Sequence, residues 1–213
     1  MTQDGRRLRG SRSREAILEQ AVGLASVEGL DGLSLGRLAT ATGTSKSGFF
    51  AHWRGKEQLQ LDAVDWAARQ WAEQVVAPAM RAPAGVRRLF ALHEARLTFY
   101  GEGVLPGGCF FFTVQAEFDD RPGAVRDRVA RAMREWQEFI RRLVTQAITA
   151  GELAESVDVA QLAYEIDALG EMVIIHSRLH DGAASSFTPA APCCNACERS
   201  APTRRFSRRI DHD

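Results

Sequence analysis

The stretch LATATGTSKSGFFAHW, residues 38–53, places the tightest limit on what this chain can fold into. Its first half carries small and hydroxylated side chains where a helix in a protein core normally carries leucines, and its second half is rich in aromatic residues. Two short helices that cross closely account for both halves, because a close crossing needs small side chains and the second helix needs a bulky anchor in the core. The sequence therefore predicts a pair of short helices joined by a tight turn.

Individual residues of this stretch have the properties that such a turn requires. Ala39 is a small residue for the crossing, and Gly43 tolerates the positive φ of a tight turn. Ser34 and Ser45 can each cap the helix that follows. Phe49 is expected to fill the core beneath the second helix. This arrangement is typical of a helix-turn-helix whose second helix lies in the DNA major groove, although an ordinary pair of short helices is the alternative.

Elsewhere, apolar residues recur at three- and four-residue steps, and no segment alternates as a strand does. No apolar run approaches the roughly 18 residues of a membrane helix, and no apolar segment follows the charged N-terminus as in a secretory signal. We therefore expect a cytoplasmic protein without a membrane partner. The fold class is all-α, and the predicted helices span residues 11–29, 34–41, 45–52, 56–76, 83–100, 109–118, 124–151 and 158–180.

The net charge of the chain is zero, but the charges are unevenly spread. Residues 1–56 hold nine Lys and Arg side chains and only five Asp and Glu side chains. A basic N-terminal region in a neutral chain indicates that this part meets a polyanion such as double-stranded DNA. The alternative is a solvated basic leader without a partner.

The segment LSLGRLATATGTSKSGFFAHWRGKEQLQLDAV, residues 33–64, resembles the DNA-binding signature of the tetracycline-repressor-like (TetR/AcrR) regulators. A second segment, LPGGCFFFTVQAEFDDRPGAVRD, is similar to the regulatory domain of one branch of that family. The resemblance implies a basic arm over residues 1–10, a three-helix DNA-binding domain over 11–57 and a helical ligand-binding and dimerisation domain over 58–181. Residues 182–213 lack a helical stripe, and we expect a disordered or atypical tail there.

The resemblance also assigns roles to residues of the second short helix. It implies that Ser45, Lys46 and Ser47 face the DNA groove, where small and polar side chains can approach base edges. Thr44 is implied to touch DNA from the turn.

Other implied DNA contacts are made to the backbone. His52 and Lys56 contact phosphates, and Arg9 and Arg12 reach the backbone or the minor groove. Phe50 stands where the family usually has a tyrosine whose hydroxyl meets a phosphate. Loss of that hydroxyl is expected to weaken DNA affinity without changing sequence preference.

The resemblance further implies a small-molecule pocket, and aromatic residues offer candidates for its lining. The alternative is that these side chains only fill a core. Cys109 can also sense oxidants, although buried packing is the commoner role of a single cysteine. The candidate lining residues are Trp66, His93, Cys109, Phe110, Phe112, Phe118 and Trp136.

Dimerisation in the family usually uses the last two helices. The helix over 158–180 carries one apolar stripe, but the tail after Gly182 does not supply the expected second helix. The sequence therefore leaves undecided whether the chain forms the usual dimer. Glu171 and His176 lie near this interface, where structural polar contacts are favoured over metal binding. The candidate interface residues are Leu162, Ile166, Leu169 and Val173.

Three cysteines, Cys193, Cys194 and Cys197, crowd together near the end of the chain, with His212 as a distant further ligand. This spacing favours neither a disulfide framework nor a structural zinc site, although a metal- or redox-responsive protein acting through these cysteines is the alternative function. No phosphate-binding glycine loop, HExxH motif or nucleophile-turn serine is present, so we predict no enzyme, catalytic residue, metal or cofactor.

These observations predict a DNA-binding transcription regulator. It would be a repressor that binds a palindromic operator as a homodimer and releases it when a small apolar effector binds.

Overall fold

The computed structural model describes the backbone of residues 3–179 and the side chains of residues 10–45, 47–176, 178 and 179. Within these ranges the chain contains helices and no strand, so the predicted all-α fold is confirmed. Their order is α1 (Gln3–Glu28), α2 (Leu35–Thr42), α3 (Lys46–Phe50), α4 (Lys56–Trp71), the π-helical η1 (Ala72–Val76), α5 (Ala77–Ala79), α6 (Val86–Gly101), α7 (Phe110–Phe118), α8 (Ala124–Thr149) and α9 (Val159–Leu179).

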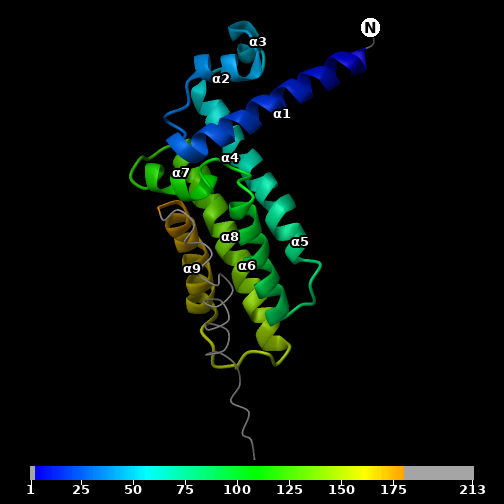
Figure 1. The fold of residues 1–213 in the computed structure, drawn as a ribbon, viewed down its shortest axis with the longest axis vertical. Helices are drawn as coiled ribbons and strands as arrows, with labels where there is room; N and C mark the ends of the chain where they lie inside the picture. The colour runs from blue at the N-terminus through cyan, green and yellow to red at the C-terminus, as the bar shows by residue number, and fades with distance from the viewer. Residues whose placement is uncertain (1–2, 180–213) are drawn as a thin grey trace, which may run out of the picture.

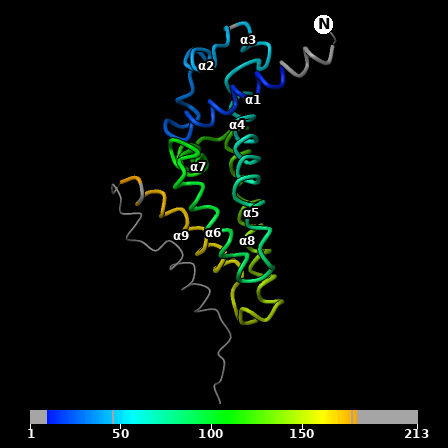
Figure 2. Tube along the Cα trace, turned by 45° about the vertical axis from the view of Figure 1, so that its right-hand side comes forward, coloured from blue at the N-terminus to red at the C-terminus, as the bar shows by residue number. Residues whose placement is uncertain are grey.

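The helices form two regions that share α4. Helices α1, α2 and α3 lie at one end of the molecule with the start of α4, and we call these helices the N-terminal unit (Figure 1). Helices α4 to α9 form an elongated C-terminal bundle, in which α9 lies on the opposite side from α4 and α5 (Figures 1 and 2). Helix α7 packs against both α1 and α8, so it joins the two regions.

A single aromatic residue organises the core of the N-terminal unit. Trp53 is 1% exposed, and its indole Nε1 donates a hydrogen bond of 2.6 Å to Oδ2 of Asp62 on α4. The same oxygen accepts a hydrogen bond of 2.6 Å from Arg14 on α1, whose guanidinium also lies over the Trp53 ring. Through these contacts Trp53, which follows α3, is bound to both α1 and α4. They therefore hold the C-terminal end of α3 against these two helices.

Several helix boundaries differ from those predicted, and two of the differences near the N-terminal half have a clear physical reason. Helix α1 begins at Gln3 rather than at Ser11, so Ser11 is not a cap and its hydroxyl donates to Glu15 one turn on. The predicted break before Pro78 is wrong, because the helical path continues through Pro78 into α5. Proline lacks an N–H, and the wider π-helical turn of η1 directly before it accommodates the missing backbone bond.

The later helices follow the predicted order. Helix α6 begins at Val86 rather than Pro83, after Gly85 in a positive-φ conformation. Helix α9 follows Asp158, the first residue of the predicted range, whose Oδ1 caps the helix by accepting hydrogen bonds from the N–H groups of Ala160 and Gln161. None of the helices in residues 3–179 is both long and apolar enough to cross a membrane.

Candidate functional site

The turn between α2 and α3 has the predicted geometry. Gly43 adopts φ +63°, which a residue with a side chain rarely does. The N–H of Thr44 donates to the carbonyl of Ala39 at 2.9 Å and that of Gly43 to Thr40 at 3.3 Å, which is the Schellman arrangement that ends a helix. The Ser34 hydroxyl caps the start of α2 by accepting from the N–H of Arg37. The helix pair is therefore closed by local hydrogen bonds.

Helix α3 is held by one capped end and one buried side chain. Ser45 Oγ accepts a hydrogen bond of 3.1 Å from the N–H of Gly48. Phe49 is 1% exposed, and its ring packs 5.1 Å from that of Trp53. A Cβ at Gly48 would lie 3.0 Å from the Thr44 methyl group, so a small residue is needed there. Phe49 fixes which face of α3 points inward and leaves the other face outside.

The outer face of α3 carries the residues that the resemblance assigned to DNA. Ser45, Ser47 and Phe50 are exposed, and the two serine hydroxyls lie 3.0 Å apart. Thr44 and His52 are half-buried at the two ends of this face. Small hydroxylated side chains on a protruding helix are suited to approach base edges and phosphates.

Three further assigned contacts lie on α1 and at the start of α3. Lys46 is the first residue of α3, while Arg9 and Arg12 lie on α1, where Arg12 is exposed. The N-terminal part of α1 and the α2–α3 pair lie at the same end of the molecule (Figure 1).

Lys56, assigned to a phosphate, has a partner within the chain. Its Nζ donates to the carbonyl oxygen of Asp31 at 2.5 Å and to Oδ1 of the same residue at 3.2 Å. Arg121, in the loop between α7 and α8, donates to the other carboxylate oxygen of Asp31 at 3.1 Å. Lys56 therefore shares one carboxylate with a residue of the C-terminal bundle, a relationship that sequence spacing did not reveal.

A residue of α7 itself also holds this loop. Glu117 accepts hydrogen bonds from the backbone N–H groups of Leu30 (2.6 Å) and Asp31 (2.7 Å), and Gln60 on α4 donates to the carbonyl of Leu30 at 3.0 Å. Gly29 makes the approach possible, because a Cβ there would lie 2.4 Å from Glu117 Oε2. We call Gly29, Leu30, Asp31 and Glu117 the α7 clamp; it joins the C-terminal bundle to the N-terminal unit.

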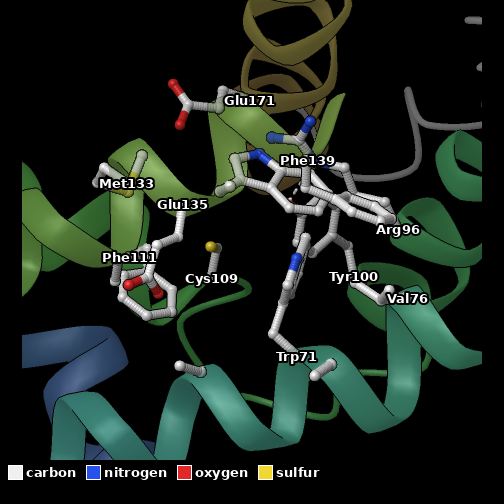
Figure 3. A pocket seen from close by; sticks show the side chains of 14 residues that line it. Trp71, Val76, Arg96, Tyr100, Cys109, Phe111, Met133, Glu135, Phe139 and Glu171 are labelled. Carbon is white, nitrogen blue, oxygen red and sulfur yellow. Dashed lines mark hydrogen bonds between the residues drawn. The ribbon is translucent and has the colours of Figure 1, made fainter. Parts of the chain in front are cut away.

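The C-terminal bundle contains a partly open cavity of about 220 Å³ between α4, α6, α7, α8 and α9. Trp71 rises from α4 toward the centre, and the sulfur of Cys109 lies between Phe111 and Trp71 (Figure 3). Most of the wall is apolar or aromatic. The lining residues are Ala68, Trp71, Ala72, Val76, Arg96, Tyr100, Cys109, Phe111, Ala132, Met133, Glu135, Trp136, Phe139 and Glu171.

One buried ion pair supports the cavity wall. Arg96 is 4% exposed; it lies 3.0 Å from Asp167 Oδ1 and donates from Nε to the Tyr100 hydroxyl at 2.8 Å. Asp167 also accepts hydrogen bonds from Trp136 Nε1 (2.8 Å) and Gln137 Nε2 (2.5 Å). Both charges are thus compensated inside the protein, as buried charges must be.

Two further ionisable groups in the wall have shifted pKa values. Burial raises the pKa of the Cys109 thiol, so the thiol keeps its proton near neutral pH and is a poor nucleophile. This favours the packing role of Cys109 over oxidant sensing. Burial, followed by the nearby charge of Asp167, raises the pKa of Glu171.

The cavity contains two of the seven residues proposed for its lining, Cys109 and Trp136. Phe110 and His93 are 2% and 3% exposed and belong to the interior outside the cavity. Phe112 and Phe118 are half-buried on α7, and Trp66 borders a separate groove beside α1. The main residues that the sequence did not single out are Trp71, Arg96, Tyr100, Phe111 and Phe139.

The apolar stripe proposed for the dimer interface is divided between two environments. Leu162 and Ile166 are 4% and 3% exposed within a single chain, so they already fill its own core, while Leu169 and Val173 are half-buried. The large exposed apolar residues of α9 are instead Tyr164, Met172 and Leu179.

Several predicted features lie outside the described residues. They are the tail over 182–213 with Cys193, Cys194, Cys197 and His212. Among residues 3–179, no group of three or more His, Cys, Asp or Glu side chains is placed to hold a metal ion.

A capped helix pair with a protruding polar face, followed by a helical bundle that contains a cavity, defines a helix-turn-helix transcription regulator. Two family models match this chain: "Bacterial regulatory proteins, tetR family" over residues 17–63, and "Tetracyclin repressor-like, C-terminal domain" over residues 85–187. The chain belongs to the TetR family of transcription regulators.

Solved structures of similar proteins agree with this assignment. A TetR transcriptional regulator from Chloroflexus aurantiacus is 30% identical, with a TM-score of 0.76, and the match covers 90% of this chain and 93% of that one. A TetR-family regulator from Cytophaga hutchinsonii shares the fold at 22% identity and a TM-score of 0.79, over 91% and 96% of the two chains. AibR, solved with isovaleryl coenzyme A and operator DNA, shares the fold at 20% identity and a TM-score of 0.67, over 89% and 98%. A comparison with curated proteins finds no match.

Proposed function

We propose that this protein is a ligand-responsive repressor that binds a palindromic operator through α3. The observation that carries the proposal is the orientation of α3: Phe49 is buried beneath it, while Ser45 and Ser47 are exposed on its outer face. In this orientation the helix can enter the major groove without moving its core anchor. Thr44, Lys46, His52 and Lys56, with Arg9 and Arg12 on α1, supply further contacts to the groove and the phosphates.

Recognition of a palindrome requires two copies of the chain related by a two-fold axis. In this proposal the exposed face of α9 that carries Tyr164 and Met172 contributes to the dimer, together with α8, against which α9 packs. The two copies of α3 would then lie about 34–36 Å apart, one turn of DNA.

The cavity supplies the ligand site in this proposal, and α7 supplies the connection to DNA. Phe111 of α7 lines the cavity, while Glu117 of the same helix holds the loop at Leu30. A ligand that shifts α7 would therefore change the position of the N-terminal unit through the α7 clamp. Release of DNA follows if the ligand favours a dimer whose α3 helices no longer match one turn of DNA. AibR, whose structure holds both a ligand and operator DNA, supports this division of labour in the fold.

Footprinting of the DNA upstream of the chain's own gene tests the proposal. The expected result is protection of a palindromic site that persists in excess unrelated competitor DNA. Protection that disappears equally with any competitor would show that the protein binds DNA without sequence preference, and the proposal would be wrong.

A further inference from the structure

The wall of the cavity favours a flat apolar body in any ligand. Trp71 and Trp136 meet edge to face with ring centroids 5.4 Å apart, and Phe139 stacks 5.9 Å from Trp136. Phe111 and Met133 close the opposite side (Figure 3). Aromatic faces carry negative electrostatic potential, so this wall also accepts a positive charge nearby.

Among the described residues that line the cavity, Arg96 is the one cation, and it is not available to an anionic ligand. Arg96 pairs with Asp167 and Tyr100, and its guanidinium lies about 6 Å from the Trp71 and Trp136 rings. It also fits closely against α9, because a Cβ at Gly170 would lie 2.3 Å from its Nη1. An anion could recruit Arg96 only by breaking this buried pair, which is costly.

Two carboxylates, those of Glu135 and Glu171, lie at the edge of the cavity. Glu171 accepts one hydrogen bond, from Gln115 Nε2 at 3.2 Å, and among residues 3–179 neither Glu171 nor Glu135 is in an ion pair. Glu171 is half-buried, so solvent screens its charge only in part. With Arg96 neutralised by Asp167, the remaining charge of the lining is negative.

From this charge balance we propose that the cavity takes an amphipathic organic cation. Its apolar, preferably aromatic, body lies among Trp71, Trp136 and Phe139, and its ammonium or amidinium group meets the carboxylate of Glu171. An ammonium group at this position neutralises a partly desolvated carboxylate. The assignment of ligand class stands on the cavity alone; its regulatory consequence rests on the proposed function.

Calorimetric titration of the full chain with three probes of the same shape tests the ligand class. The probes are naphthylmethylammonium, naphthylmethanol and naphthoate, compared at mildly alkaline pH so that Glu171 is ionised. We expect the ammonium to bind about tenfold more tightly than the alcohol, and the naphthoate to bind more weakly than the alcohol. Equal affinity for ammonium and alcohol, or tighter binding of naphthoate, would overturn the proposal.

A pair of variants tests whether the carboxylate of Glu171 contacts the ammonium group of the probe. Glu171→Gln should weaken ammonium binding by about tenfold and leave alcohol binding unchanged. Glu138→Gln is the matched control, because Glu138 lies on α8 outside the cavity lining and should change neither. An ammonium affinity that Glu171→Gln leaves unchanged would contradict the assigned contact, and the wild-type comparison of probes decides the ligand class independently of any variant.

Addition of operator DNA separates this proposal from the proposed function. If the ammonium binds preferentially but does not release the operator, the ligand class stands and ligand-responsive repression fails. If naphthoate binds preferentially and releases the operator, the repressor function stands and the ligand class is wrong.

Discussion

The carboxylate of Glu117 accepts a hydrogen bond of 2.6 Å from the backbone N–H of Leu30, a residue 87 positions earlier in the chain. The second carboxylate oxygen accepts from the N–H of Asp31 at 2.7 Å. Both oxygens of one α7 side chain therefore hold the loop that leads from α1 into the α2–α3 pair. Because Phe111 of α7 also lines the cavity, this helix connects the cavity wall with the N-terminal unit.

The first prediction concerns the glycine that allows this contact. Gly29→Ala forces a side chain into φ +77° and places its Cβ 2.4 Å from Glu117 Oε2, so the clamp must open. We expect a loss of at least about 2 kcal/mol in the free energy of unfolding, from backbone strain and from lost charge-assisted hydrogen bonds. Urea unfolding measures this free energy for the wild type and the variant. Gly101→Ala is the control, since a Cβ there meets nothing within 4 Å; equal stability of the two variants would refute the clamp.

The second prediction concerns Lys56, which donates to Asp31 in the structure. If Lys56 also contacts a phosphate in the complex, Lys56→Ala weakens binding to all DNA sequences by a similar factor. It also makes the negative slope of log affinity against log salt concentration shallower by about one. Fluorescence anisotropy over a salt series measures both. Arg87→Ala on α6 should leave the slope unchanged, and an unchanged slope for Lys56→Ala would exclude the phosphate role.

The third prediction concerns the buried pair of Arg96 and Asp167, whose side chains are 5% and 6% exposed. Asp167→Ala leaves the guanidinium buried without its carboxylate and also removes the acceptor of Trp136 Nε1. The expected cost is about 3–5 kcal/mol in the free energy of unfolding. Glu94→Ala, which removes a solvent-exposed partner of Arg87, should cost less than about 1 kcal/mol. Similar costs for the two variants would show that Arg96 does not depend on Asp167.

The fourth prediction is a pH dependence that arises from Glu171. Its pKa is raised in the folded state by burial and by Asp167, so the folded protein holds this proton more tightly than the unfolded chain. The carboxylate therefore costs stability as pH rises from its unfolded pKa through its folded pKa. Glu171→Gln removes that cost, and its Tm should exceed that of the wild type more at pH about 8 than at pH about 4. A difference in Tm that is constant over this range would mean that the Glu171 charge is not destabilising.

Local features of the fold were predictable from the sequence because they depend on neighbouring residues. The cap at Ser45, the positive φ of Gly43 and the burial of Phe49 each follow from side-chain chemistry within a few positions. Helical periodicity similarly located the later helices. The path through Pro78 was missed, because a proline usually ends a helix and the π-helical turn before it has no clear sequence signature.

The cavity and the α7 clamp could not be predicted in the same way. Periodicity places Phe110 and Phe111 on different faces of α7, but it does not say which face meets the core and which the cavity. The pairs Arg96–Asp167 and Glu117–Leu30 join residues 71 and 87 positions apart, so they depend on how whole helices pack. Leu162 and Ile166 form an apolar stripe whether it faces the chain's own core or a second subunit.

The most direct test of the central claim is the affinity of the protein for its operator compared with a scrambled sequence of equal length, measured by anisotropy for wild type and for Lys46→Ala. If the outer face of α3 reads DNA, the wild type should prefer the operator by at least about 10³-fold at physiological salt, and the variant should lose much of that preference. Equal wild-type affinity for the two sequences would contradict the account.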